Sequence, residues 1–175
     1  SQLNATTGEF NTSLGSLSMG TGVTTGDSNV AIGYKAAQAL TSGGSNIIIG
    51  ELAGANAAAT SNNIAIGYKS LFTENNHGKN TAVGHQSLQT LRAGADGYNT
   101  AVGFQAGLLV TTGISNVIVG ARAGTALTTG AANVIIGETT GSGLTIGNYN
   151  TALGYGALST SVDGDYNTAI GHKAL

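Results

Sequence analysis

A five-residue pattern of polar, apolar and glycine positions recurs along the whole chain. It starts with Asn, continues with a variable residue and a small or apolar one, and closes with an aliphatic residue followed by Gly. Successive copies begin 17 residues after one another, except for one spacing of 18 and one of 19. A period held over ten copies indicates a repeat architecture and excludes a disordered low-complexity chain. The copies begin at Asn11, Asn29, Asn46, Asn63, Asn80, Asn99, Asn116, Asn133, Asn150 and Asn167.

A repeat of this length predicts one coil of a β-solenoid. Helical repeats need about 33 residues or more, whereas 17 residues suit two short strands and two tight turns. Coils stacked at the strand spacing of about 4.8 Å would make a rod about 45–50 Å long. We therefore predict an all-β parallel β-solenoid (β-roll) of about ten coils. We expect residues 1–175 to form a single repetitive domain from a longer fibrous protein.

The invariant Asn and Gly positions predict a structural ladder. Identical amides stacked one above another can hydrogen-bond along the stack, as they do in cross-β assemblies. Glycine at a fixed position supplies a turn at which a Cβ atom would be strained or crowded. The ladder residues that we assign are Asn29, Asn46, Asn63, Asn80, Asn99, Asn116, Asn133, Asn150, Gly33, Gly50, Gly67, Gly84, Gly103, Gly120, Gly137 and Gly154.

The third and fourth positions of the pattern predict a strand that is apolar on both faces. Side chains alternate along a strand, so these two positions point in opposite directions. We place the fourth in the core because it is aliphatic in all ten copies. The third is apolar in nine copies, which is unusual for a face in contact with water. We expect other copies of the chain to cover it, most simply as a homotrimer, through Ala31, Ile48, Ala65, Ala101, Ile118 and Ile135.

The composition excludes several classes of partner. Charged residues make up 8% of the chain, and the formal net charge is −2, so we expect no nucleic-acid partner. The absence of Cys excludes disulfides, Cys-ligated zinc, iron–sulfur clusters and thiol catalysis. No apolar run approaches the roughly 18 residues of a membrane span, so we expect no membrane insertion by this segment.

We expect no enzymatic activity, catalytic residue, metal or cofactor. The three histidines, His77, His85 and His172, are scattered, and the spacing supports neither a Ser–His–Asp arrangement nor a pair of catalytic carboxylates. Asp163 and Asp165 flank a Gly, which is typical of a turn.

Aromatic residues fall on two columns of the repeat. The column after the conserved Gly supplies our candidate receptor-binding residues, Tyr34, Tyr68, His85, Phe104 and Tyr155. The column before the Asn contains Phe10, Tyr98, Tyr149 and Tyr166. Rings at these positions can contact a glycan through an apolar body and a polar tip, or can seal the gap between chains or cap turns. The basic column that follows (Lys35, Lys69, Arg122 and Lys173) is interpreted as a solvated edge that prevents lateral aggregation.

The repeat is interrupted by two polar stretches that predict loops. Two extra residues enter the stretch Leu91–Tyr98, and Glu74–His77 is a second polar segment. Insertions in solenoids form loops on one side of the rod, often the binding side. A neutral drift in repeat length is the alternative interpretation.

The repeats resemble two families of surface fibres. Asn29–Gly33, Asn63–Gly67 and Asn80–Gly84 are similar to the head repeats of YadA-like trimeric autotransporter adhesins. The longer unit from Asn99 to Gly107, followed by Thr111–Gly113, resembles repeats in phage tail fibres. The period is longer than that of the adhesin head. The resemblance implies a homotrimeric fibre on a virion tail or a bacterial cell surface, with a cell-surface glycan or protein receptor as its partner.

A free-standing solenoid that binds ice or a glycan is the alternative function. Regular Thr columns can bind ice, but here the residue after Asn alternates between Thr and aliphatic residues. A polysaccharide-degrading spike is less consistent with the sequence, since the eight acidic residues do not form an evident catalytic cluster.

Overall fold

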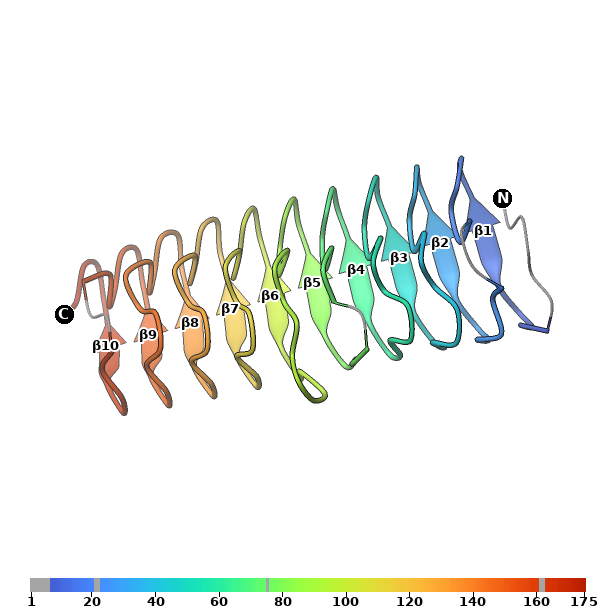
Figure 1. The fold of residues 1–175 in the computed structure, drawn as a ribbon. Coiled ribbons are helices and arrows are strands. Elements are labelled where there is room, and N and C mark those ends of the chain that lie inside the picture. Colours follow the sequence, from blue (N-terminus) through green and yellow to red (C-terminus); the bar gives the residue numbers. More distant parts are fainter. Residues whose placement is uncertain (1–6, 21–22, 75, 161–162) are drawn as a thin grey trace.

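Each copy of the pattern forms one coil of a parallel β-solenoid. The structure is a computed structural model that describes residues 7–20, 23–74, 76–160 and 163–175. One strand from each coil joins a single ten-stranded parallel sheet in chain order (Figure 1). The strands are β1 (Thr12–Leu14), β2 (Val30–Ile32), β3 (Ile47–Ile49), β4 (Ile64–Ile66), β5 (Thr81–Val83), β6 (Thr100–Val102), β7 (Val117–Val119), β8 (Val134–Ile136), β9 (Thr151–Leu153) and β10 (Thr168–Ile170).

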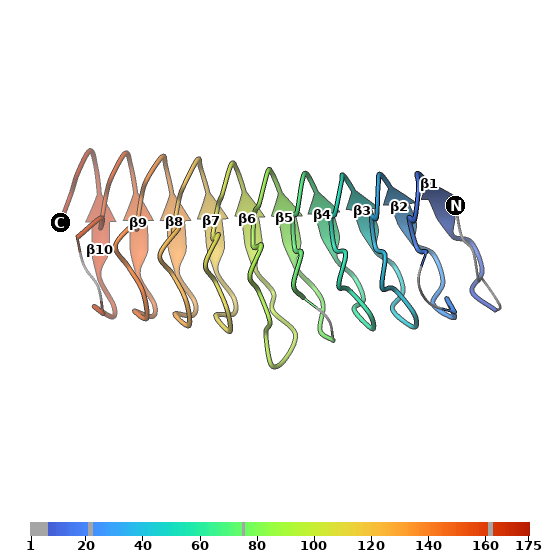
Figure 2. The same ribbon diagram turned by 45° about the horizontal axis from the view of Figure 1, so that its top comes forward.

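Each coil contributes one strand, where the sequence pattern predicted two. In the coil that begins at Asn46, the opposite wall consists of two consecutive turns. The Ala53 amide donates to the Gly50 carbonyl (3.2 Å), and the Ala57 amide donates to the Gly54 carbonyl (3.0 Å). Hydrogen bonds between coils continue along these turns, as from Gly54 N to Ser70 O (2.9 Å). The wall opposite the sheet is therefore stacked in register, although its backbone is not extended (Figure 2).

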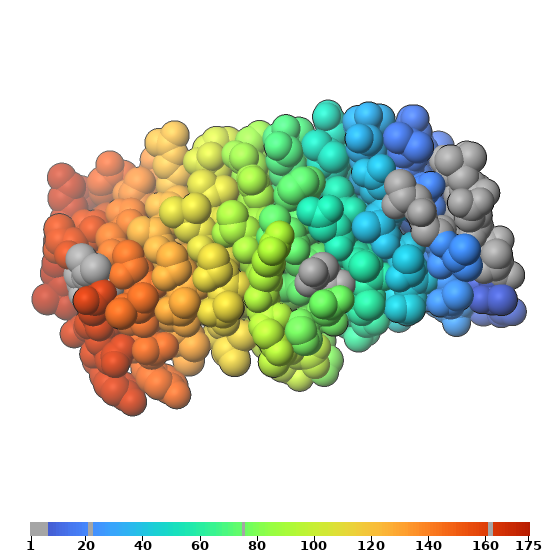
Figure 3. All heavy atoms as spheres, viewed as in Figure 1, coloured from blue at the N-terminus to red at the C-terminus, as the bar shows by residue number. Residues whose placement is uncertain are grey.

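Residues with positive φ close each coil. In the same coil, Ser45 (φ 59°), Leu52 (φ 58°) and Gly54 (φ 49°) all adopt the left-handed conformation. The left-handed conformation costs about 1–2 kcal/mol at a residue that has a Cβ atom, such as Ser45 or Leu52. The same positions are left-handed in neighbouring coils, so the backbone bends identically from coil to coil. Buried side chains fill the coils, and the chain forms a continuous rod (Figure 3).

The third position of the pattern faces the interior of the coil, and our assignment of this position to a trimer interface is wrong. All six residues of that assignment are at most 1% exposed: Ala31, Ile48, Ala65, Ala101, Ile118 and Ile135. The fourth position, which we expected in the core, lies on the outer face, as the 37% exposure of Val102 illustrates. The two faces of the strand were therefore interchanged.

The buried Asn explains the orientation of the strand. Asn116 is 0% exposed because its amide bonds to neighbouring coils inside the rod. Side chains two residues apart along a strand point the same way. Ile118 must therefore point inward with Asn116, whereas Val117 and Val119 point outward.

The buried third position is matched in size by a residue on the facing turn, six positions later. Where the third position is Ile, the facing residue is Gly: a Cβ atom on Gly54 would lie 3.0 Å from Ile48 Cδ1. Where the third position is Ala, four of the six coils have Leu opposite, as in Ala65 with Leu71. The small Ala101–Gly107 pair is the clearest exception; there, side chains from the two adjacent coils approach Gly107, as the 3.0 Å from its Cβ position to Ile118 Cδ1 shows. Most coils thus combine one large and one small residue at this pair of positions.

Exchanging the members of one such pair is expected to preserve stability when each single change does not. Ile48→Ala leaves a cavity and should lower the unfolding free energy by about 2–4 kcal/mol. Gly54→Leu overpacks the site and should cost about 1–3 kcal/mol. The double variant should lie within about 1 kcal/mol of the parent, because Ala opposite Leu is the arrangement of other coils and Leu71 also has a left-handed backbone (φ 50°).

Urea unfolding followed by circular dichroism measures this double-mutant cycle. Leu109→Ala is the control, because Leu109 is 46% exposed and should change stability by no more than about 0.5 kcal/mol. If the two losses of unfolding free energy simply added in the double variant, the side chains at positions 48 and 54 would not fill the same space in the core.

The inserted residues form a longer loop between β5 and β6, visible as a protrusion in Figures 1 and 2. Beneath it, Glu74 occupies a column position that is aliphatic in most other coils, and it is 0% exposed. Its carboxylate accepts hydrogen bonds from the backbone amides of His77 and Ala93, each at 3.2 Å. Because Ala93 lies in the inserted loop, this buried carboxylate fixes the base of the loop. Of the second predicted loop, Asn75 lies outside the described residues.

Candidate functional site

The predicted Asn ladder lies inside the rod. The Asn116 backbone N and side-chain Nδ2 both donate to Asn99 Oδ1, at 3.0 and 3.2 Å, and Nδ2 also donates to Gly130 O at 2.9 Å. Asn116 Oδ1 accepts the equivalent pair of bonds from Asn133, both at 3.0 Å. The other ladder asparagines from Asn29 to Asn150 are equally buried. The ladder therefore joins coils and is not itself available to a ligand.

The conserved glycines have a backbone that excludes other residues. Those from Gly15 to Gly171 adopt φ between 127° and 138°, where residues with a Cβ atom are strained. They also stack closely: a Cβ atom on Gly120 would lie 2.5 Å from Gly137 O. Like the Asn ladder, the glycines determine the fold and position the side chains that follow them.

The outward positions of the sheet form a strip of aliphatic and Thr side chains along the rod. Like residues are stacked in register, as in Val102 beside Val119. Several are substantially exposed in the single chain, including Ile47 at 40% and Leu153 at 44%. This outer strip consists of the second and fourth positions of the pattern in β2 to β9, namely Val30, Ile32, Ile47, Ile49, Ile64, Ile66, Thr81, Val83, Thr100, Val102, Val117, Val119, Val134, Ile136, Thr151 and Leu153. Sequence reasoning identified the apolar surface but attributed it to the wrong positions.

The candidate receptor-binding residues all lie on the turn after the conserved Gly, but only some are in contact. Tyr68, His85 and Phe104 form a continuous stack, with ring centroids 5.0 and 5.1 Å apart. Tyr155 stacks on His172 at 5.4 Å. Tyr34 is separated from Tyr68 by one coil, in which Glu51 occupies the same position. The column therefore contains one central stack and one shorter pair.

Polar side chains flank the central stack. Lys69 Nζ lies 5.2 Å from the Tyr68 ring centroid, and Arg122 Cζ lies 5.9 Å from that of Phe104. Between them, Gln105 Nε2 donates a 2.9 Å hydrogen bond to Gln86 Oε1. Two cations thus lie at the ends of a row of rings, with paired amides alongside. Sequence analysis placed these cations in one column but did not connect them with the rings.

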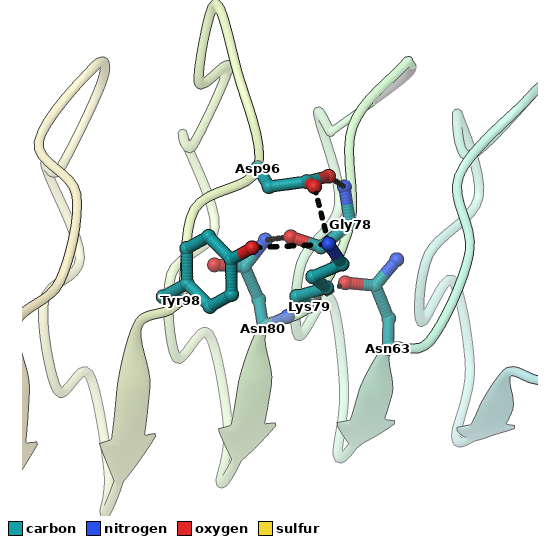
Figure 4. Close-up of polar contacts among 6 residues, drawn as sticks. All are labelled: Asn63, Gly78, Lys79, Asn80, Asp96 and Tyr98. Carbon is teal, nitrogen blue, oxygen red and sulfur yellow. Dashed lines mark hydrogen bonds and ion pairs between the residues drawn. The ribbon is translucent and has the colours of Figure 1, made fainter.

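The second aromatic column borders a charged cluster near the inserted loop. Lys79 Nζ lies 2.7 Å from Asp96 Oδ2 and donates to the Tyr98 hydroxyl at 3.0 Å (Figure 4). The hydrogen bond to Asp96 raises the pKa of Lys79 above its ordinary value and lowers the pKa of Asp96. Farther along the column, Tyr149 and Tyr166 stack at 5.1 Å. The ion pair joins two coils at the point where the repeat is interrupted.

The fold and the ladder define the chain as a parallel β-solenoid repeat protein with a period of about 17 residues. Comparison with protein-family models, curated proteins and solved structures finds no match to this chain. Among the described residues, no group of three or more His, Cys, Asp or Glu side chains is arranged to hold a metal ion. In the same part of the chain, no helix is long and apolar enough to cross a membrane.

Proposed function

We propose that this chain is a structural and adhesive segment of a homotrimeric fibre that attaches a virion tail or a bacterium to a cell surface. The observation that supports it is the outer strip, whose outward aliphatic side chains are half-buried or exposed in each coil from β2 to β9. A contiguous apolar surface of this extent is characteristic of an interaction site. The similarity of the repeats to adhesin heads and tail fibres supports the attachment role.

The repeat itself favours further copies of this chain as the occupant of the strip. Val102, Val119 and Ile136 follow one another at the spacing of successive strands. A partner that packs against every coil needs apolar side chains at the same spacing, and a second copy of the chain has them. Three copies around one axis give closed symmetry, which protects the strip without open-ended association.

Charges placed on the outer strip are expected to convert the trimer into monomers. In Val102→Lys/Val119→Glu the two new charges lie opposite each other on neighbouring strands, so they compensate within one chain. At an interface between chains they would be desolvated, which is costly. Light scattering after size-exclusion chromatography should give about three times 17.2 kDa for the parent and about 17.2 kDa for the variant.

Thr112→Lys/Thr129→Glu is the matched control for this experiment. Both Thr residues are exposed, lie in the same two coils and are outside the outer strip. This variant should remain trimeric. A parent protein that is monomeric at micromolar concentration would contradict the fibre proposal.

A free-standing ice-binding or glycan-binding rod is the second candidate. Its supporting observation is that Thr81, Thr100 and Thr151 lie on the outward side of a regular sheet, next to aliphatic residues. A monomeric parent with thermal hysteresis or ice-crystal shaping would favour this function over the fibre.

A further inference from the structure

We propose that the central stack, together with the two cations at its ends, binds an anionic polysaccharide laid along the rod. The site consists of Tyr68, His85 and Phe104 with Lys69 and Arg122. The ligand class is a glycan that bears carboxylate or sulfate groups. This inference rests on the proposed attachment function and specifies the chemistry of its receptor.

The stacking of the rings determines which part of each ring meets a ligand. His85 lies between Tyr68 and Phe104, at centroid separations of 5.0 and 5.1 Å and interplanar angles of 32° and 20°. The ring faces are therefore directed at one another, and the edges are left for an approaching molecule. Aromatic edges carry positive potential, whereas the faces are negative. A row of exposed ring edges therefore favours contact with anionic oxygens over contact with the apolar face of a neutral sugar.

The charges around the stack favour the same class of ligand. The chain has six Lys and Arg residues, and four of them lie in the column beside the rings. Lys69 and Arg122 are close to the two ends of the stack, at 5.2 and 5.9 Å from the terminal ring centroids. The Gln86–Gln105 pair adds amide groups between these cations, and amides hydrogen-bond to sugar hydroxyls.

Acidic residues delimit the site along the rod. The position occupied by the rings is taken by Glu51 in the coil before Tyr68. It is taken by Ala121 and then by Glu138 in the two coils after Phe104. Both carboxylate side chains are exposed. A polyanion is therefore attracted to the central coils and repelled beyond them. The rings follow one another at 5.0 and 5.1 Å along the rod, so an extended chain laid along it contacts all three in turn.

Loss of both cations is expected to weaken binding of the polysaccharide strongly. The probes are polyglucuronate for carboxylates and heparin for sulfates, measured by calorimetry at low salt with neutral dextran for comparison. The parent should bind at least one of the two anionic probes and not dextran. Lys69→Gln/Arg122→Gln should weaken that binding about tenfold, and added salt should reduce the difference because it screens exposed charges.

Two further variants and one control ligand separate this site from general charge attraction. Lys35→Gln/Arg92→Gln removes the same charge from outside the central stack and should retain binding within about twofold. Phe104→Ala should weaken binding about threefold by removing one ring edge. Duplex DNA should bind more weakly than the preferred glycan. Equal binding of DNA, an equal loss in the Lys35/Arg92 variant, or no binding of either anionic probe would overturn the proposal.

The mass of every variant, measured on the same samples, distinguishes failure of this site from failure of the fibre. A trimer that binds neither anionic glycan would overturn the ligand assignment and leave the fibre intact. A monomer that still binds through Lys69 and Arg122 would support the site and contradict the fibre.

Discussion

Replacing Asn116 with alanine is expected to lower the unfolding free energy by about 4–6 kcal/mol, although the change removes only one small side chain. The Asn116 amide donates to Asn99 Oδ1 and Gly130 O, and its Oδ1 accepts two bonds from Asn133. Alanine leaves each of these partners buried and without that bond. An unsatisfied buried polar group costs about 1–3 kcal/mol, so several together exceed the cost of an ordinary core deletion.

An isosteric variant separates the hydrogen bonds of Asn116 from its packing. Asn116→Asp keeps the shape of the side chain, but it replaces the donating amide with an oxygen that faces Asn99 Oδ1 and Gly130 O. At neutral pH it should lower the unfolding free energy as much as Asn116→Ala does, since it also buries a charge. The exposed Asn56 is the control, and Asn56→Ala should change stability by no more than about 0.5 kcal/mol.

Urea unfolding measures these differences, and hydrogen exchange locates them. Stability in a solenoid is approximately a sum of terms for coils and for the contacts between neighbours. Faster amide exchange should therefore concentrate in β6, β7 and β8, which flank the altered ladder position. An Asn116→Ala protein as stable as the Asn56→Ala control would mean that the ladder contributes little to stability.

Gly120→Ala is the second change expected to have a large effect. The new methyl group would lie 2.5 Å from Gly137 O and 2.6 Å from Gly137 C, both of which belong to backbone. The φ of 134° adds strain, because this region is occupied almost only by glycine. We expect a loss of at least about 3 kcal/mol, since neither the clash nor the strain is relieved by rotating a side chain.

Gly94→Ala is the matched control for this substitution. A Cβ atom there would have no neighbour within 4 Å, because Gly94 lies in the inserted loop. Thermal unfolding by calorimetry should show a large fall in Tm for Gly120→Ala and a small change or a rise for Gly94→Ala. If both variants had the same Tm as the parent, the close stacking of the glycine column would be contradicted.

The sequence was sufficient to predict the solenoid, its period and the ladder positions, but not the orientation of the strand. Alternation requires that Ile118 and Val119 point in opposite directions, yet both are aliphatic, so hydrophobicity alone cannot decide which one is buried. The decisive signal was Asn116. An amide that bonds to backbone inside the coil forces Ile118 inward with it, but the sequence does not show on which side of the strand that amide lies.

The size matching across the core was also present in the sequence as a covariation within most coils. Ile48 with Gly54 and Ala65 with Leu71 are opposite combinations of large and small residues. Their contact became evident only when the facing turn was placed, because a turn in which Gly50 and Leu52 have positive φ separates Ile48 from Gly54. The aromatic column was predicted from the sequence. The positions of Lys69 and Arg122 beside the two terminal rings of the central stack, which excludes Tyr34, became evident only from the contacts in the structure.

The in-register stacking of every column has a consequence for how the length of the rod can change in evolution. Each residue pairs with the equivalent residue of the next coil, so the two faces of any coil are complementary to almost any other coil of the same period. Unequal recombination between gene copies of the 17-residue unit would add or remove whole coils without creating a new type of contact. Each event would change the rod by about 4.8 Å. Length could therefore vary between lineages in small equal steps while the surface chemistry of the remaining coils is inherited unchanged.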